Sequence, residues 1–111
     1  MDYKIALVPG DGIGKEITPA GLEILKSAAG MHGFTIATEE FGYGAGYYKS
    51  HGHFMPPGAL DYLRSFDAIL FGAVGLPDVD DTLPAKDYTF KVRTGFQQYV
   101  NFRTVRIWPG V

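Results

Sequence analysis

A turn with three closely spaced glycines follows the first apolar run of this chain, and no other feature constrains the fold as strongly. Residues 5–8 are all apolar, and Gly10, Gly12 and Gly14 then occupy alternate positions. A helical pattern of apolar residues begins directly afterwards. A strand, a tight glycine turn and a helix in this order are typical of the ligand-binding edge of an α/β sheet.

The spacing of these glycines excludes two common nucleotide motifs. The loop reads G-x-G-x-G, one residue short of the dinucleotide fingerprint G-x-G-x-x-G. It also lacks the hydroxyl residue that a phosphate loop places after its lysine, because Glu16 follows Lys15. The loop therefore predicts a ligand-binding edge of the sheet but does not identify the ligand. A glycine-rich connection that binds no ligand remains the alternative.

Composition narrows the class of protein. The 111 residues match one small domain, with 46% apolar and 20% charged residues. The net charge is −2 and no Lys/Arg-rich run occurs, which argues against nucleic acid as a partner. No apolar run approaches the ~18 residues of a membrane span. The absence of cysteine and of a signal-peptide pattern leads us to expect a cytoplasmic location.

Alternating strand and helix patterns predict an α/β fold with a mostly parallel sheet and flanking helices. Strands are expected at residues 5–8, 34–41, 68–71 and 104–108, and helices at 17–28 (ending at Gly30), from Pro57 through Leu63, and at 90–100. Segments 42–58 and 77–87 are expected to be irregular. Three helices cannot cover four strands, so we expect the chain to be the N-terminal part of one incomplete domain without an internal boundary. A complete small domain is the alternative.

Three motifs occur in a specific order. They are LVPGDGIGKEI at 7–17, FGAVGLP at 71–77, and KVRTGFQQYVNFRTVR at 91–106, where Arg93 and Arg103 stand ten residues apart. Together they closely resemble the start of the β-decarboxylating dehydrogenases, the family of isocitrate, isopropylmalate, and D-malate or tartrate dehydrogenases. The final residues are most similar to the malate/tartrate and isopropylmalate branches.

The resemblance implies an enzyme that oxidises and decarboxylates a 2-hydroxy dicarboxylic acid, using NAD or NADP and Mg²⁺ or Mn²⁺. It implies a homodimer for the full-length parent. The residues it assigns to the cofactor are Gly12, Ile13, Gly75, Leu76 and Pro77. The small dicarboxylate substrate would be bound by Arg93 and Arg103, whose guanidinium groups suit bidentate contacts with carboxylates, and by Thr89.

The residues before Arg93 bear on the choice of acid. Isopropylmalate enzymes resemble this chain here but carry a small residue and a leucine where it has Tyr88 and Thr89. Polar side chains at these positions favour a small polar acid such as malate or tartrate over isopropylmalate.

The family takes its catalytic tyrosine and lysine and its metal-binding aspartates from beyond residue 111. We therefore assign no catalytic residue, expect cofactor and metal to be bound mostly by the missing part, and expect this fragment alone to be inactive. Two other functions stay open. One is a truncated, non-catalytic protein that binds a dicarboxylate or associates with a full-length subunit, and the other is a self-contained nucleotide-binding domain.

Several polar residues have simpler interpretations than ligand binding. Asp11 is expected to cap the helix that follows the glycine turn, because a carboxylate is favoured at a helix N-terminus. His51 and His53 are expected to be surface residues and not metal ligands. Asp78, with the nearby Asp80 and Asp81, is expected to lie in a solvated acidic loop.

Overall fold

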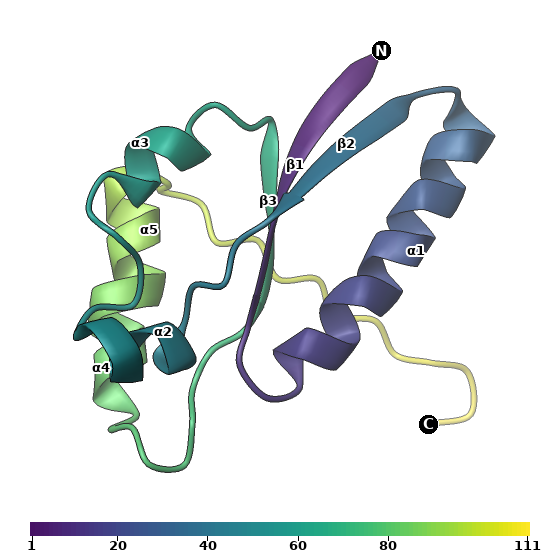
Figure 1. Cartoon of the computed structure of the whole chain (residues 1–111). Coiled ribbons are helices and arrows are strands. Elements are labelled where there is room, and N and C mark those ends of the chain that lie inside the picture. Colours follow the sequence, from purple (N-terminus) through teal and green to yellow (C-terminus); the bar gives the residue numbers. More distant parts are fainter.

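The computed structural model describes all 111 residues and contains a three-stranded parallel sheet (Figure 1). Strand β1 (Asp2–Gly10) lies in the centre, between β2 (Thr35–Glu40) and β3 (Ala68–Ala73), in the order β2-β1-β3. Both neighbours run parallel to β1. The α/β class and the first three predicted strands are confirmed.

One face of the sheet is covered by a single long helix, α1 (Gly14–His32) (Figure 1). The helix ends where Gly33 takes a φ of 70°, a left-handed conformation that glycine adopts without steric cost. The expected end at Gly30 is wrong, because Gly30 keeps helical geometry three residues before the true stop.

The other face is covered by short helices: α2 (Ala45–His51), α3 (Ala59–Leu63), α4 (Thr82–Pro84), the π-helix η1 (Ala85–Phe90) and α5 (Lys91–Gly95). The last three follow one another without a break (Figure 1). The segments expected to be irregular therefore contain helices, and the predicted helix at 90–100 starts earlier and ends at Gly95. Beyond it Gln97 has a φ of 55°, which a continuing helix does not allow.

The main core lies between the sheet and these short helices. Ala6 and Val8 of β1 contribute to it, while the alternate residues Ile5 and Leu7 are buried on the side of α1. Strand β3 is only half-buried, although its sequence predicted a buried strand. It forms an edge of the sheet, so one side of the strand has no neighbouring strand to cover it.

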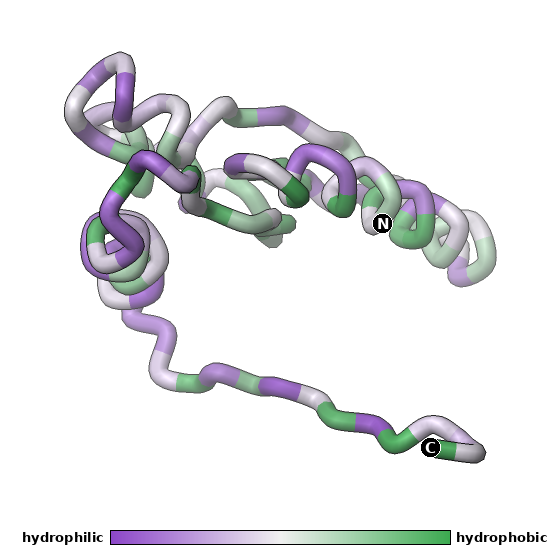
Figure 2. Tube along the Cα trace, turned by 90° about the horizontal axis from the view of Figure 1, so that it is seen from below, coloured by the Kyte–Doolittle hydropathy of each residue, from purple (hydrophilic) through white to green (hydrophobic).

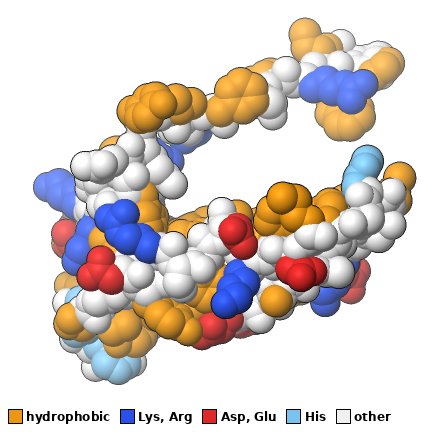
Figure 3. Space-filling model, turned by 90° about the horizontal axis from the view of Figure 1, so that it is seen from above, with side chains coloured by type: hydrophobic (Ala, Val, Ile, Leu, Met, Phe, Trp, Pro, Cys, Tyr) orange, Lys and Arg blue, Asp and Glu red, His pale blue; other side chains and the backbone are white.

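Residues 97–111 form neither helix nor strand, and all of them are exposed. This C-terminal segment leaves the body of the molecule at the end of α5 and carries hydrophobic side chains along its length (Figures 2 and 3). The predicted strand at 104–108 is wrong: Val105 and Ile107 alternate with polar residues as expected but are 91% and 81% exposed. A strand needs a neighbour for its backbone hydrogen bonds, and this segment has none.

The extended segment also explains the overall size. The radius of gyration is 15.4 Å, whereas a compact chain of this length has a value of about 13 Å. None of the helices is long and apolar enough to cross a membrane.

Candidate functional site at the carboxyl edge of the sheet

The segments that follow β1 and β3 lie side by side, and their backbones are in contact. Gly10 pairs with Ala73 in the sheet, and the Asp11 N–H donates to the Ala73 carbonyl oxygen at 2.7 Å. A Cβ at Gly10 would stand 1.9 Å from that oxygen. At Gly14 a Cβ would stand 1.9 Å from the Pro9 carbonyl oxygen. These two glycines are therefore required for contact between chain segments, not for contact with a ligand.

Two other glycines lie open. A Cβ added to Gly12 or to Gly75 would meet no atom within 4 Å, and both residues have positive φ, 52° and 140°. The Ile13 side chain beside Gly12 is 62% exposed. Leu76 and Pro77 continue the second loop, half-buried and exposed respectively. All five residues assigned to the cofactor thus lie on two adjoining loops, and the backbone of these loops is open at Gly12 and Gly75.

The Asp11 side chain is buried, 6% exposed, and does not cap α1 as expected. The N-cap residue of α1 is Ile13, with no side-chain hydrogen bond. The Asp11 carboxylate instead accepts hydrogen bonds from the N–H groups of Ala45 (2.7 Å), Gly46 (2.9 Å) and Gly75 (3.1 Å). Asp11 therefore joins the first loop to α2 and to the second loop.

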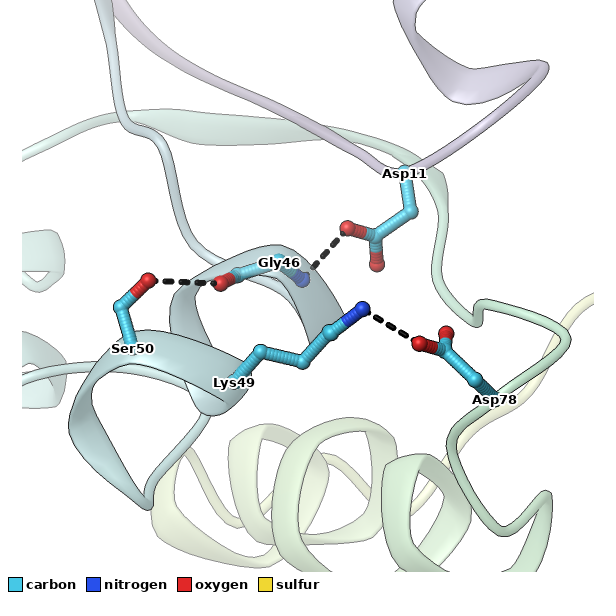
Figure 4. A network of polar contacts seen from close by, with 5 residues as sticks. All are labelled: Asp11, Gly46, Lys49, Ser50 and Asp78. Atoms are coloured by element: carbon cyan, nitrogen blue, oxygen red, sulfur yellow. Dashed lines mark hydrogen bonds and ion pairs between the residues drawn. The ribbon is translucent and has the colours of Figure 1, made fainter.

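A second polar link joins α2 to the second loop (Figure 4). The Lys49 ammonium donates a hydrogen bond to Asp78, and this contact lowers the pKa of the Asp78 carboxyl group. Both side chains are at least half exposed, so water screens the attraction and the pair contributes little to stability. The sequence offered no signal for this pair, because its members stand 29 residues apart.

A groove of about 730 Å³ lies between β3 and α5. Thr89 and Arg93, the two residues near this position that the resemblance assigns to the substrate, both line it. Arg93 is half-buried, and its guanidinium carbon lies 5.9 Å from the centre of the Phe90 ring. Arg103 lies outside the groove, in the exposed C-terminal segment, and neither arginine forms an ion pair. The structure thus brings Thr89 and Arg93 together and leaves Arg103 apart.

Arg64 also lines this groove and was not singled out from the sequence. Its guanidinium donates to the Gly95 carbonyl oxygen and lies over the Phe96 ring, with a centroid distance of 5.0 Å. These contacts fix the end of α5 against α3, so Arg64 supports the wall of the groove. A lone arginine in an amphipathic segment gives no sequence signal for such a role.

Tyr88 faces the core and not the groove. Its side chain is fully buried, and its hydroxyl group has no hydrogen-bond partner. Burial raises the pKa of the Tyr88 phenol, and the negative charge of Asp11 adds to the rise. Of the two polar residues that favoured a small polar acid, Thr89 lines the groove and Tyr88 does not.

No group of three or more metal-ligating side chains lies together in this chain. His51 stacks on Tyr47 with a centroid distance of 3.9 Å, and His53 is exposed. In the acidic loop, Asp80 accepts hydrogen bonds from the Thr82 side chain and backbone, and these bonds lower the pKa of its carboxyl group.

Open glycine loops at the carboxyl ends of parallel strands, beside a groove lined by an arginine, define an α/β protein with a ligand edge. Comparison with known families then gives the particular family. The model of the isocitrate/isopropylmalate dehydrogenase family matches residues 4–111, so the chain belongs to this family.

Individual relatives agree with this membership. The chain is 48% identical over 111 residues to the "Probable tartrate dehydrogenase/decarboxylase" of Agrobacterium vitis, covering 99% of this chain and 31% of that protein. It is 46% identical over 110 residues to the decarboxylating D-malate dehydrogenase of Escherichia coli K12, covering 97% of this chain and 30% of that enzyme. The chain thus spans about a third of the length of these relatives.

A solved structure shares the fold. The apo form of a β-decarboxylating dehydrogenase from Thermococcus kodakarensis superposes with a TM-score of 0.67 at 26% sequence identity. The match covers 86% of this chain and 27% of that one. The expected resemblance and the expected fold are confirmed.

Proposed function

We propose that this chain is the N-terminal part of an NAD(P)-dependent oxidative decarboxylase acting on a small 2-hydroxy dicarboxylic acid of the D-malate or tartrate kind. One observation carries the proposal: two open glycine loops adjoin at the carboxyl edge of the sheet, in a chain whose family consists of such dehydrogenases. The similarity to a tartrate and a D-malate enzyme supports this choice of acid.

Each assigned residue has a role that its chemistry allows. NAD or NADP, when bound, accepts a hydride from the substrate carbon. Ile13 presents an apolar face to the nicotinamide, and Gly12 and Gly75 let the ring approach the backbone. Arg93 holds a substrate carboxylate through paired hydrogen bonds, and the Thr89 hydroxyl suits a polar substrate tail.

We further propose that residues 1–111 alone do not catalyse the reaction, because they bring no metal-ligand set together. Arg103 would reach the substrate only when the C-terminal segment is held against the rest of a longer protein. The dimer and the cytoplasmic location that we expect from the sequence remain predictions.

A non-catalytic protein that associates with a full-length subunit is the second candidate. It is favoured by the exposed apolar residues of the C-terminal segment, among them Phe102 at 84% and Trp108 at 66% exposure. An unpaired edge strand, β3, adds to the surface available for association.

The proposal is tested by joining residues 1–111 to the remaining two thirds of the E. coli D-malate dehydrogenase. This chimera should reduce NAD with D-malate or tartrate. Replacing Arg93 or Arg103 by alanine should raise KM for the acid roughly ten- to a hundredfold and leave KM for NAD unchanged, because each replacement removes a charge-assisted contact worth about 1.5–3 kcal/mol.

Two further variants of the chimera sharpen the test. Arg93→Lys should recover only part of the affinity, because an ammonium group cannot form the paired contact. Lys91→Ala changes an exposed cation on the same helix and should leave both KM values unchanged. A soluble, folded chimera without activity on these acids would refute the proposal and favour the association protein.

A further inference from the structure

One buried carboxylate, that of Asp11, meets chain segments from all three strand exits. Its own residue follows β1, Ala45 and Gly46 belong to the segment after β2, and Gly75 follows β3. No cation contacts it: the only ion pairs of the chain are Lys49–Asp78 and Arg64–Asp61. Three backbone N–H groups therefore stabilise a carboxylate that is only 6% exposed.

The contacts divide unequally between the two carboxylate oxygens. Oδ2 accepts from Ala45 and from Gly75, while Oδ1 accepts from Gly46 alone. The first N–H groups of α2 are thus already used, and they offer nothing to a ligand. The absence of a side chain at Gly44 leaves room for this carboxylate. A Cβ at Gly44 would stand 2.8 Å from Asp11 Oδ2, and the φ of 143° also favours glycine.

The hydrogen bonds of Asp11 lie next to the residues of both glycine loops that are assigned to the cofactor. Asp11 stands directly before Gly12 and Ile13 of the first loop, and its Oδ2 fixes Gly75 of the second. Gly12 and Gly75 are the two glycines with free space around them, one in each loop.

We propose that Asp11 is a positioning residue for the nicotinamide cofactor: its carboxylate holds Gly75 and α2 against the first loop and thereby sets the gap between Ile13 and the second loop. The proposal rests on the proposed dehydrogenase function. Asp11 touches neither the cofactor nor the substrate and acts only through the backbone groups that it binds.

Asparagine and alanine at this position have different expected effects. An asparagine can point its oxygen at Ala45 and Gly75, but its amide nitrogen then faces the Gly46 N–H, which loses its acceptor. Alanine leaves all three N–H groups without an acceptor. Asp11→Asn should therefore lose one of the three hydrogen bonds, and Asp11→Ala should lose all three.

Amide hydrogen exchange of the 111-residue chain tests the contacts directly, without activity. In Asp11→Asn the Gly46 amide should exchange roughly ten- to a hundredfold faster, and in Asp11→Ala the amides of Ala45 and Gly75 should follow. Asp81→Asn, at an exposed aspartate, is the matched control. Unchanged exchange of all three amides in Asp11→Ala would overturn the proposal.

Kinetics of the chimera test the positioning role. Asp11→Asn should raise KM for NAD at least fivefold and leave KM for the acid within twofold. A purely structural defect would instead lower the amount of folded enzyme, and hence the apparent kcat, with both KM values unchanged.

Gly44→Ala offers a second route that leaves the carboxylate in place. It should displace α2 from Asp11 and produce the same selective rise in KM for NAD, even if Asp11→Ala fails to fold. Gly42→Ala is its control, because a Cβ there meets no atom within 4 Å.

The outcomes separate the two proposals. An active chimera in which both Asp11→Asn and Gly44→Ala keep the wild-type KM for NAD would overturn the positioning role and leave the dehydrogenase function standing. A wild-type chimera that folds but has no activity would overturn both.

Discussion

Replacing the three glycines of the first loop by alanine, one at a time, separates two physical costs. Gly12 has a positive φ but free space around it, and Gly14 has a close backbone neighbour but no positive φ. Gly10 has both, with a φ of 75° and the Ala73 carbonyl oxygen 1.9 Å from a Cβ position. The variants should therefore differ although the motif is regular.

The magnitudes follow from these contacts. A left-handed alanine costs roughly 1–2 kcal/mol, of which the stiffer unfolded chain returns about 0.4–1 kcal/mol. Gly12→Ala should therefore cost about 1 kcal/mol. A Cβ at Gly10 must also push the two strand exits apart and break the hydrogen bond from Asp11 to Ala73, a further loss of about 1–3 kcal/mol. Gly14→Ala should fall between the two.

Urea unfolding followed by circular dichroism measures these differences. With a slope of about 1–3 kcal/mol per molar urea, the midpoint of Gly10→Ala should lie roughly 1 M below that of Gly12→Ala. Equal midpoints for the two variants would refute the reasoning, because the backbone contact between the loops would then contribute nothing. A Gly14→Ala variant as stable as wild type would do the same.

Further predictions concern other parts of the chain. Limited trypsin digestion should cut first after Arg103 and Arg106 in the exposed C-terminal segment, as mass spectrometry can show. Tyr88→Phe removes a buried hydroxyl without a partner and should raise the free energy of unfolding by about 1 kcal/mol in urea titrations, whereas a loss would mean that the hydroxyl is bonded. The contact with Lys49 lowers the pKa of Asp78, so it stabilises the fold above the ordinary value of 3.8 and is lost as pH falls through the folded pKa. The melting temperatures of wild type and Lys49→Ala should accordingly show a small difference at pH 7, because the pair is exposed, and converge in acid.

Local sequence was enough for the presence of β1, the glycine turn and α1, although both the strand and the helix begin three residues before their predicted starts. An apolar run buried on both faces, followed by glycines that the backbone geometry requires, leaves few other structures. The end of α1 was misplaced because Gly30 and Gly33 look alike in sequence, and only their φ values distinguish a helical glycine from a stop.

Elements that depend on distant partners were not predicted. Helix α2 has no capping side chain of its own, since its N-cap residue is Gly44, and the acceptor for its first N–H groups comes from Asp11, 34 residues earlier. The pattern at 104–108 is that of a strand, but a strand also requires a neighbour, which sequence pattern does not supply.

In the candidate site, too, sequence located the residues that depend on local spacing and missed those that depend on distant partners. Motif resemblance singled out Thr89 and Arg93, and the structure brings both to one groove, because their spacing of four residues puts them on one side of a helical segment. Their role in substrate binding stays a prediction. It could not show that Tyr88 faces the core, since the π-helix changes which residues face inward. Asp11 was assigned to the nearer helix, whereas its partners are distant in sequence.

The long-range contacts of Asp11 also set the order in which this edge can form during translation. Its last hydrogen-bond donor, Gly75, lies 64 residues further along the chain. At about 5–20 residues per second, a ribosome adds that donor roughly 3 to 13 s after Asp11. During this interval the glycine turn after β1 is present, but the Asp11 carboxylate lacks the N–H donor of Gly75. A nascent chain that stalls before Gly75 has the donors from Ala45 and Gly46 but lacks the third donor and the second loop, so Asp11 cannot yet join the two loops.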